Sequence, residues 1–548
     1  MSVESRVRDL VGKLNPQQRA QLKSAVAKLG VTPAARSNLR GRSAFERSDY
    51  SKAIAHAENG LTRRPTQKQL LRLASDVNVR TGDLSSAYAF AQQLSTVDSA
   101  PSSWTHSRKI EGRLRETDEY WMPTVESRTP PTAGTSVLYV AKESRPFHDN
   151  GFCTRTHETL SSLVSQGTHI TCVTMPGFPA NVGVSDAAQE SRVENVVYRH
   201  LLPRAGGLDK DLAYDEYLQL TTQLLAAELY KNPAAMLHVG SGHRGYETAL
   251  AASAVASWAG IPWIYEVRSF FETTWTADAR YRESAEYFYR RLHTETRMMH
   301  QANAVVTISG PMRDEIVHQH GVDPDKVYVI PNAVDVKRFA PVSRDKDLAN
   351  SLDIGEKFVV GYVSNISHPR EGQEVLVEAI KLLKDQGRDV IAILVGDGKR
   401  RSEIEGIAKR LGVAGRVKFT GNIPFDHVSK YYGLLDLFVV PRIDERAGRL
   451  VSPIKPFEAM AMGIPLLMSD LPALVEIAGE QRRAHTFKAG DADDLAREIR
   501  SLEDDPAERK RMIESSAQWV KEERDWQKTA ESFNSVYASV LAQQAPSS

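Results

Sequence analysis

The sequence predicts an α/β protein in which two doubly wound domains follow one another, preceded by an all-helical region. Short apolar runs that read as buried strands alternate with helical patterns from residue 137 to residue 541, and a second domain of this kind starts near Lys357. Residues 1–130 lack such runs and keep helical periodicity instead. A chain of 548 residues is also too long for a single core, so about three domains are expected.

Composition narrows the class of protein. A hydrophobic content of 41% and a charged content of 25% are ordinary for a soluble globular chain, and the net charge of +1 gives no reason to expect a nucleic-acid partner. The two cysteines, Cys153 and Cys172, offer neither a disulfide framework nor a metal-binding spacing. No signal-peptide core follows Met1, and no apolar run approaches the roughly 20 residues that span a bilayer. We therefore expect a cytoplasmic protein, with peripheral attachment at the inner face of a membrane as an alternative.

Residues 3–29 predict an amphipathic helix with a basic polar face. Apolar residues recur there every three to four positions, and residues 1–42 contain nine lysines and arginines against Glu4 and Asp9. One interpretation is an interfacial helix on an anionic membrane surface. The other is a helix that packs on its own protein, which the lack of large aromatic anchors favours.

Residues 36–100 contain an internal repeat. Asp49, Ala53 and Ala57 recur as Asp83, Ala87 and Ala91, each 34 residues later, and Pro65 and Pro101 close the two units. This period is that of tetratricopeptide helix pairs, so the region resembles two tetratricopeptide-like repeats. It is either an adaptor for a protein partner or a membrane complex, or a helical cap on the rest of the chain.

The first α/β domain begins after a linker at residues 127–135 (SRTPPTAGT). A strand at 137–140, a helix at 156–166 and a strand at 169–175 form a βαβ unit, which starts a parallel sheet. In the loop before this helix, Asn150-Gly151 permits close approach of the backbone. Further strands are predicted at 235–239, 262–267, 304–309 and 327–331, with helices at 249–259 and 311–320.

Polar side chains occur where these strands end: His238, Arg268, Ser309 and Asn332. In a doubly wound sheet, the carboxyl ends of the strands line the ligand crevice, so their shared location makes this group a candidate for ligand binding.

The second α/β domain is predicted to start near Lys357. Its expected strands are 358–363, 390–395, 417–420, 437–440 and 464–468, and its expected helices are 374–384, 491–502 and 506–521. A last helix at 526–541 is expected to return to the first α/β domain. Lys455 and Glu458 open a short helix that ends before Gly463, where backbone N–H groups favour an anion. They predict either a nucleotide site or a capped helix with a solvated charge pair.

Several longer segments carry a family resemblance. IPNAVDVKRFAP resembles an interdomain signature, GYVSNISHPREGQEVLVEAIKLL the first βα unit of a donor domain, and VPRIDERAGRLVSPIKPFEAMAMGIPLLMSDLPALVEI a donor-binding segment. These segments resemble the family 4 glycosyltransferases (glycosyl transferases group 1), which have GT-B architecture. The same family is resembled by two segments of the first α/β domain, NGFCTRTHETLSSLVSQGTHITCVT and AGIPWIYEVRS. The resemblance covers residues 136–545. It implies two Rossmann-like domains that face a cleft: an acceptor domain at 131–335 and a donor domain at 336–525, with a helical region at 1–130 and a returning helix at 526–548.

The resemblance also implies a reaction. Members of the family move a sugar from a nucleotide diphosphate sugar to an acceptor hydroxyl, with retention and without a cofactor or an obligatory metal. Such chemistry needs cations and N–H donors around the leaving diphosphate, a carboxylate for the ribose and a closed cleft for the acceptor. We expect a glycan or lipid-linked acceptor in polysaccharide, glycolipid or envelope-glycan synthesis, with residues 1–130 available to a protein partner or an anionic membrane surface.

Matched positions assign roles to individual residues. Glu458 corresponds to the glutamate that binds ribose, and Lys455 stands where a cation meets the donor phosphate. His243 falls in the loop that faces the transferred sugar and is preferred over His238 for that role. The predicted catalytic residues are therefore His243, Lys455 and Glu458. The predicted donor-binding residues are Gly151, Arg268, Ser364, Asn365, Arg370, Gly421, Arg442, Lys455 and Glu458, and no metal ligand is predicted.

Three positions depart from the common family pattern. Leu450 stands where many members have a second glutamate, and Asn365 and Glu371 take the places of an arginine and a lysine in the first loop of the donor domain. Pro453-Ile-Lys455 resembles a variant branch of the family. The cations that could compensate are Arg370, Arg442, Arg449 and Lys455.

The departures keep two other functions open. One is a non-catalytic adaptor, in which a GT-B body and tetratricopeptide-like repeats scaffold an assembly complex. The other is a sugar-nucleotide epimerase on the same fold.

Overall fold

The computed structural model describes residues 32–126, 129–203, 208, 211–480 and 482–543, so the amphipathic helix predicted at 3–29 lies outside the described residues. The chain forms two compact units. The first comprises Met1–Trp121, Asp209–Leu218 and Glu272–Thr294, and the second comprises Met122–Leu208, Gln219–Phe271 and Glu295–Ser548.

The first unit is helical. Its N-terminal helices are α3 (Pro33–Glu46), α4 (Tyr50–Leu61), α5 (Lys68–Thr81), α6 (Leu84–Val97) and α7 (Pro101–Glu116). The 34-residue spacing has a structural counterpart, because Asp49 caps α4 through Lys52 N and Asp83 caps α6 through Ser86 N. The alanines of the repeat are fully buried: Ala53, Ala57, Ala87 and Ala91. Small side chains at these positions let the helices pack closely; assignment to the tetratricopeptide class stays a prediction.

Two later segments of the chain, Asp209–Leu218 and Glu272–Thr294, also belong to this unit. The sequence did not predict that they would. Glu286 accepts hydrogen bonds from Ser85 N and Oγ, at 2.9 and 2.7 Å. The guanidinium of Arg108 donates to both carboxylate oxygens of Asp215, at 2.9 and 2.7 Å. The helices α9 (Tyr214–Lys231) and α11 (Glu286–Gln301) each contain residues of both units.

The second unit contains two sheets, and the first has the strand order β3-β4-β2-β1-β5-β6-β7-β8. Its strands are parallel except for the β3–β4 pair. They are β1 (Ser136–Ala141), β2 (Ile170–Thr174), β3 (Glu190–Val193), β4 (Val196–His200), β5 (Ala234–Gly240), β6 (Trp263–Val267), β7 (Ala304–Thr307) and β8 (Val327–Val329). Among its helices are α8 (Gly151–Ser165), α10 (Glu247–Ala259) and α12 (Gly310–His318). The helix predicted from residue 156 begins at Gly151, because Asn150 Oδ1 accepts from Phe152 N and Cys153 N and caps α8.

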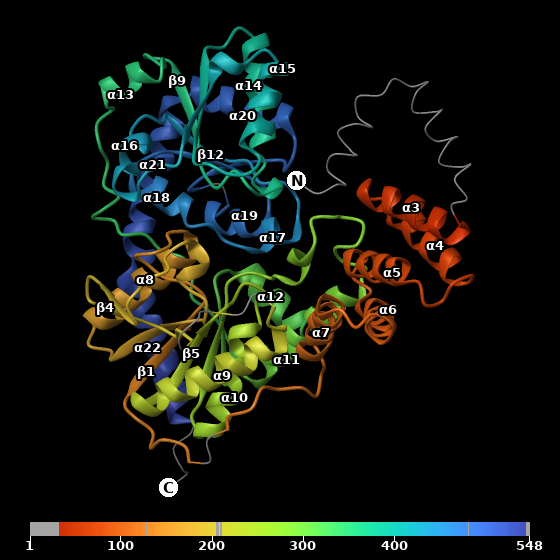
Figure 1. Ribbon diagram of the computed structural model, residues 1–548. Helices are drawn as coiled ribbons and strands as arrows, with labels where there is room; N and C mark the ends of the chain where they lie inside the picture. Colours follow the sequence, from red (N-terminus) through yellow and green to blue (C-terminus); the bar gives the residue numbers. More distant parts are fainter. Residues whose placement is uncertain (1–31, 127–128, 204–207, 209–210, 481, 544–548) are drawn as a thin grey trace, which may run out of the picture. The chain divides into compact units, whose positions relative to one another are not determined.

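The last helix, α22 (Trp526–Ala542), packs with α8 on the first sheet (Figure 1). Phe533 is fully buried and Tyr537 is buried in the core that this sheet shares with Leu160 and Leu163 of α8. The Tyr537 hydroxyl lies 2.6 Å from His238 Nδ1 inside this core.

The second sheet is fully parallel, in the order β11-β10-β9-β12-β13-β14. Its strands are β9 (Phe358–Val363), β10 (Val390–Val395), β11 (Val417–Gly421), β12 (Leu437–Val440), β13 (Leu466–Ser469) and β14 (His485–Phe487). Its helices are α13 (Lys346–Ser351), α14 (Gln373–Asp385), α15 (Arg401–Arg410), α16 (Val428–Tyr432), α17 (Arg446–Leu450), α18 (Lys455–Ala461), α19 (Pro472–Ala478), α20 (Ala492–Asp504) and α21 (Pro506–Glu523). In Figure 1 its strands lie between a layer with α14, α15 and α20 and a layer with α16, α18 and α21.

Short 3-10 helices complete the secondary structure: η1 (Ala180–Val182), η2 (Glu272–Trp275), η3 (Pro324–Lys326), η4 (Pro369–Glu371), η5 (Ala414–Arg416) and η6 (Phe425–His427). None of the described helices combines the length and the apolar character that a membrane crossing requires. The predicted fold, two Rossmann-like sheets with an all-helical N-terminal region, is confirmed.

The strand orders locate two switch points. The chain changes direction across the sheet between β1 and β5 in the first sheet and between β9 and β12 in the second. Ligands of doubly wound sheets bind outside the carboxyl ends of the strands at such points. The loops that follow β1, β5, β9 and β12 are therefore where a functional site is expected.

Candidate functional site

A buried carboxylate lies at the start of α18. Glu458 is only 1% exposed, and its Oε2 accepts from the hydroxyl of Tyr432 at 2.8 Å. The ammonium of Lys455 lies 3.1 Å from both carboxylate oxygens and keeps about a third of its side chain exposed. A carboxylate has about four acceptor positions. Tyr432 and Lys455 use most of them, so Glu458 retains capacity for about one further hydroxyl donor. Tyr432 was not predicted, because it is 26 residues away and no local pattern links it to Glu458.

The loop after β9 leads into the uncapped N-terminus of α14. Gly372 precedes the helix with a φ of +64°, and a Cβ there would lie 1.9 Å from the carbonyl oxygen of Pro441. No side chain of Gly372 can cap this helix, and Val375 N donates to Gly372 O at 3.0 Å, so only the earlier N–H groups of the first turn are left to a ligand or water. The amide of Gln373 donates to Ser364 Oγ at 3.0 Å and to Asn365 O at 3.3 Å, which holds both predicted residues beside this helix end.

Tight glycine contacts bring the neighbouring strand ends to the same place. A Cβ on Gly396 would lie 2.0 Å from the carbonyl oxygen of Ser364, and one on Gly398 would lie 2.3 Å from the carbonyl carbon of Ile366. Gly421 ends β11 with a φ of +74°, and its carbonyl accepts from Gly396 N at 3.1 Å. Two of the predicted donor-binding residues, Ser364 and Gly421, thus belong to one cluster of backbone turns at the carboxyl edge of the second sheet.

The predicted cation Arg442 forms a buried ion pair instead of an open phosphate contact. Its guanidinium lies 3.2 and 3.3 Å from the two oxygens of Glu371 and donates to Val451 O at 2.8 Å. Burial would raise the pKa of Glu371, but Arg442 and Arg370 hold it at about 2. Arg370, about a third exposed, contacts the same carboxylate at 3.2 Å. Glu371 therefore neutralises one of these two cations and orients both beside α14.

Arg449 and Leu450 lie on α17. The Arg449 side chain is about half exposed and pairs with Asp444 at 2.8 Å. Leu450 contributes its carbonyl, which accepts from Ser309 Oγ at 2.6 Å. The loop after α17 is held in the same way, since Asn332 Nδ2 donates to Ser452 O at 2.8 Å. Ser309 and Asn332, predicted as ligand-facing strand ends, thus tie the loops of the two sheets together.

Arg268 lies in a buried network at the end of β6. Its guanidinium donates to Glu266 Oε2 and to the Tyr139 hydroxyl, both at 2.6 Å, and to Thr156 Oγ1 at 2.8 Å. Burial would raise the pKa of Glu266, but Arg268 and Arg155 hold it well below its usual range. The prediction that Arg268 binds the donor is untested. In this structure its side chain is directed into the protein, where it would position the loop after β1.

His238 shares this buried surrounding. Its side chain is fully buried against the rings of Tyr139 and Phe533, and burial lowers its pKa. His238 is therefore part of the core of the first sheet.

His243 lies exposed on the loop after β5, at the first switch point. Neighbouring protein groups desolvate the ring in part, and this together with Lys142 lowers its pKa, whereas Glu247 and Glu143 act in the opposite direction. A neutral imidazole at neutral pH can accept a proton or a hydroxyl hydrogen bond. The position is consistent with the predicted role beside the transferred sugar.

A charged group after β1 was missed at the level of sequence. Glu143 Oε2 lies 2.8 Å from His148 Nδ1, and its Oε1 accepts from Asn150 Nδ2 at 2.7 Å. Lys142 lies 3.6 Å from the ring centroid of Phe152, and burial lowers its pKa. Gly151 follows this group, and a Cβ there would meet nothing within 4 Å, so the loop is open at that point. Two charged residues directly after a predicted strand were the available signal.

Within the described residues, one cluster has ligand atoms close enough for a metal ion. The side-chain ligand atoms of Glu143, His148 and Cys153 lie within 4.8 Å of one another. Burial raises the pKa of Cys153 to about 12, which opposes the thiolate that a metal needs. Since Glu143 already binds His148 and Asn150, these residues fit a hydrogen-bonded loop better than a metal site.

Two family models match the chain on either side of the interdomain segment. The family described as "Glycosyltransferase Family 4" matches residues 150–338, and "Glycosyl transferases group 1" matches residues 343–519. The chain is thus similar to one glycosyltransferase family model in each of these two segments. The two matches lie on the first and the second sheet, respectively.

Curated relatives match this chain only in part. A 2-deoxystreptamine glucosyltransferase of Streptomyces kanamyceticus is 27% identical over 41% of this chain and 57% of its own length. A GDP-mannose-dependent alpha-(1-6)-phosphatidylinositol monomannoside mannosyltransferase of Mycolicibacterium smegmatis is 27% identical over 36% of this chain and 52% of its own length. The chain thus spans about half the length of the curated relatives it matches.

Solved structures share the fold. Sucrose-phosphate synthase of Thermosynechococcus elongatus aligns with a TM-score of 0.62 at 20% identity, over 75% of this chain and 100% of its own. Anabaena HepE in complex with UDP and glucose aligns with a TM-score of 0.56 at 17% identity, over 74% of this chain and 100% of its own. At such identities the likeness concerns the fold alone.

Proposed function

We propose that this protein is a glycosyltransferase that moves a sugar from a nucleotide diphosphate sugar to an acceptor hydroxyl, with retention and without an obligatory metal. The observation that carries the proposal is the buried Glu458, held by Lys455 and Tyr432 at the carboxyl edge of the donor-type sheet. The acceptor position that these contacts leave on its carboxylate suits a ribose hydroxyl. HepE, whose structure holds UDP and glucose, has the same fold, which agrees with a nucleotide-sugar donor.

The diphosphate would lie at the N-terminus of α14. The uncapped N–H groups there and the helix dipole favour an anion, Arg370 lies in the turn that precedes the helix, and Lys455 would supply further positive charge. During transfer the bond between the sugar and the phosphate oxygen breaks, a bond between the sugar and the acceptor oxygen forms, and the acceptor proton passes to the departing diphosphate. Negative charge grows on the diphosphate, so donors fixed before the reaction stabilise the transition state more than the bound donor.

The acceptor side is assigned to the loops after β1 and β5. His243 and the Glu143–His148 pair lie there, and Gly151 keeps the backbone open to a ligand. We infer a glycan or lipid-linked acceptor, in the synthesis of a polysaccharide, a glycolipid or another envelope glycan.

A panel of UDP-, GDP- and ADP-sugars tests the proposal. One nucleotide class should raise the thermal unfolding temperature, and the matching nucleotide sugar should release nucleotide faster when an acceptor glycan is added. The anomeric configuration of the product, read by NMR, reports retention. If no nucleotide shifts the unfolding temperature and no donor turns over, the proposal is wrong.

A non-catalytic adaptor is the second candidate. It is favoured by Glu371, which stands where the family has a cation and neutralises Arg442. Nucleotide binding without turnover of any donor would support the adaptor. Interconversion of the donor sugar without an acceptor would instead indicate an epimerase.

A further inference from the structure

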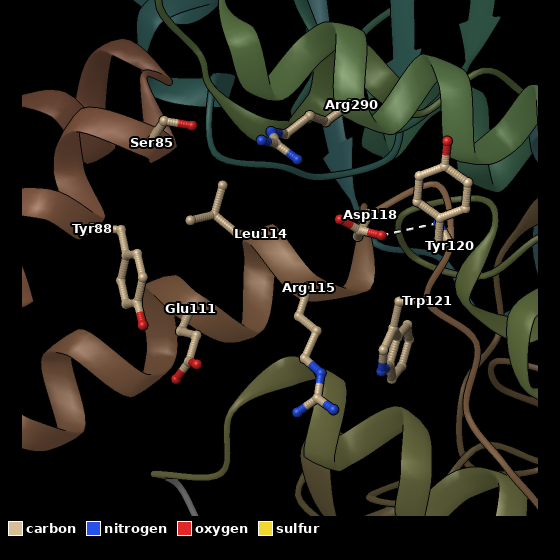
Figure 2. Close-up of a pocket in the computed structure, with 9 residues that line it drawn as sticks. All are labelled: Ser85, Tyr88, Glu111, Leu114, Arg115, Asp118, Tyr120, Trp121 and Arg290. Atoms are coloured by element: carbon tan, nitrogen blue, oxygen red, sulfur yellow. Dashed lines mark hydrogen bonds between the residues drawn. The ribbon is translucent and has the colours of Figure 1, made fainter.

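The helical unit contains a pocket that is separate from every residue of the transferase site (Figure 2). Its volume is about 600 Å³, within the range of small-molecule sites. The lining residues are Ser85 and Tyr88 of α6, Glu111, Leu114 and Arg115 of α7, Asp118, Tyr120 and Trp121 of the segment after α7, and Arg290 of α11. All of them belong to the first compact unit.

Aromatic side chains stand at both ends of this pocket. In Figure 2, Tyr88 lies at one end and Tyr120 and Trp121 lie at the other, with Leu114 between them. Tyr120 is 86% exposed, although Asp118 Oδ1 accepts from its backbone N–H at 2.9 Å and fixes the turn that presents it. Exposed aromatic faces of this kind gain free energy when an apolar surface covers them. The C–H faces of sugar rings are such surfaces.

The polar side chains of the pocket carry no net charge. Glu111 and Asp118 balance Arg115 and Arg290. An anionic headgroup, a phosphate or a nucleic acid requires an excess of cations, which this lining does not provide. Carboxylates and guanidinium groups each offer two hydrogen-bonding atoms side by side, which suits the paired hydroxyls at the edge of a sugar ring.

The charged side chains are also held from outside the pocket. Arg115 lies 3.5 Å from Asp215, and Glu111 lies 3.6 Å from Arg108. The pKa of Tyr88 is raised by burial and by Glu111, so its hydroxyl stays a hydrogen-bond donor at neutral pH. The lining is therefore partly ordered before a ligand arrives, which lowers the entropy cost of binding.

We propose that this pocket binds neutral sugar rings, in the form of a short neutral oligosaccharide. Tyr120 and Trp121 stack on the faces of the sugar rings. Glu111, Asp118 and Arg115 form hydrogen bonds with the hydroxyl groups at the ring edges. Oligosaccharide binding at this pocket requires neither a nucleotide sugar nor sugar transfer, so it can be tested independently of the reaction proposed above.

The test uses the full chain without nucleotide. Saturation-transfer NMR and calorimetry are recorded with tetrasaccharides of glucose, mannose, galactose and N-acetylglucosamine, and with polyglutamate, polylysine and phosphatidylglycerol vesicles as counter-probes. At least one neutral tetrasaccharide should bind, and Tyr120→Ala and Trp121→Ala should each weaken it about tenfold, the loss typical of one aromatic contact. Trp121→Phe, which keeps a ring face, should restore most of the affinity.

Trp104→Ala is the matched control, because Trp104 lies on α7, is 67% exposed and does not line the pocket. It should leave tetrasaccharide affinity unchanged. Binding of no neutral tetrasaccharide, an equal loss in Trp104→Ala, or preferential binding of a peptide or the vesicles would overturn the proposal. Circular dichroism of each variant shows that the fold persists, and nucleotide release measured in parallel reports on the transfer reaction alone.

Discussion

Glu458 shows how a single buried carboxylate can remain available to a ligand. Tyr432 and Lys455 stabilise its charge in the core, yet they occupy only part of its acceptor capacity. A carboxylate without such partners would be costly to bury. The same two contacts hold its orientation before a donor arrives.

The first prediction concerns Lys455. Lys455→Ala should lower kcat/KM for the nucleotide sugar on the order of 100-fold, since it removes a fixed cation near the developing diphosphate charge. Steady-state nucleotide release measures this. Arg449→Ala is the control, because Arg449 is half exposed and already pairs with Asp444; its kinetics should match those of the wild type. Equal rates in Lys455→Ala and the wild type would remove Lys455 from the site.

The second prediction concerns the buried pair of Glu371 and Arg442. Glu371→Gln should lower the free energy of unfolding at pH 7 by about 3 kcal/mol, because it leaves the guanidinium of Arg442 buried without its counter-charge. Urea unfolding measures the change. Glu374→Gln, three residues later and at a side chain that is about a quarter exposed, should cost much less.

The pH dependence of this pair has a definite sign. The pKa of Glu371 is about 2 in the folded chain, below its ordinary value near 4.5. Its contribution to stability is therefore complete above pH 4.5 and is lost as the pH falls from there toward 2. The difference in stability between the wild type and Glu371→Gln should shrink between pH 6 and pH 3.5. A difference that stays constant over this range would contradict the assigned pKa.

These residues also show how far the sequence could predict the site. Lys455 and Glu458 were predicted because they share one helical turn, and the structure brings them together. Arg442 and Arg268 stay predicted donor-binding residues, and what the sequence did not predict is that each contacts a buried carboxylate, Glu371 and Glu266, respectively. Spacing along the chain does not reveal such pairing, because Glu371 and Arg442 are 71 residues apart.

At the scale of elements, apolar runs explain which strands could be predicted. The strands β9, β10 and β12 match the predicted ranges, since a central parallel strand is covered on both faces and reads as a continuous apolar run. The edge strands β3 and β14 were missed because they are short and partly exposed. The start of α8 was placed five residues late because Asn150, its cap, was read as part of the loop.

The third prediction concerns the turn into α14. Gly372→Ala should lower the unfolding temperature and weaken nucleotide binding together, because Gly372 has a φ of +64° and a Cβ would lie 1.9 Å from Pro441 O. The helix end that we assign to the diphosphate would have to move. Gly387→Ala also has a positive φ, +76°, but meets nothing within 4 Å. Gly387→Ala should therefore lower stability without weakening nucleotide binding. If Gly387→Ala also weakened nucleotide binding, the effect of Gly372→Ala could not be assigned to the turn into α14.

At the scale of the whole chain, the two sheets of the second unit are joined twice. The chain passes from the first sheet to the second near Val334 and returns near Asp525, and these two segments pair with each other as an isolated bridge. Val334 N donates to Arg524 O at 2.8 Å. The return was predicted from the position of the last helix, whereas the bridge has no sequence signal because it rests on backbone atoms.

The fourth prediction tests what this return contributes. Phe533 of α22 is fully buried under the first sheet, with its ring centroid 5.0 Å from that of His238. Phe533→Ala should lower the free energy of unfolding by about 3–5 kcal/mol, the range for a large aromatic side chain removed from a core. Ser535→Ala, on the exposed face of the same helix, controls for changes in helix propensity and should change it little. If both variants unfold at the same urea concentration as the wild type, the last helix does not hold the first sheet. If only Phe533→Ala unfolds early, residues beyond 525 are required for the stability of the first sheet, and a chain truncated at residue 525 should be unable to keep that sheet folded.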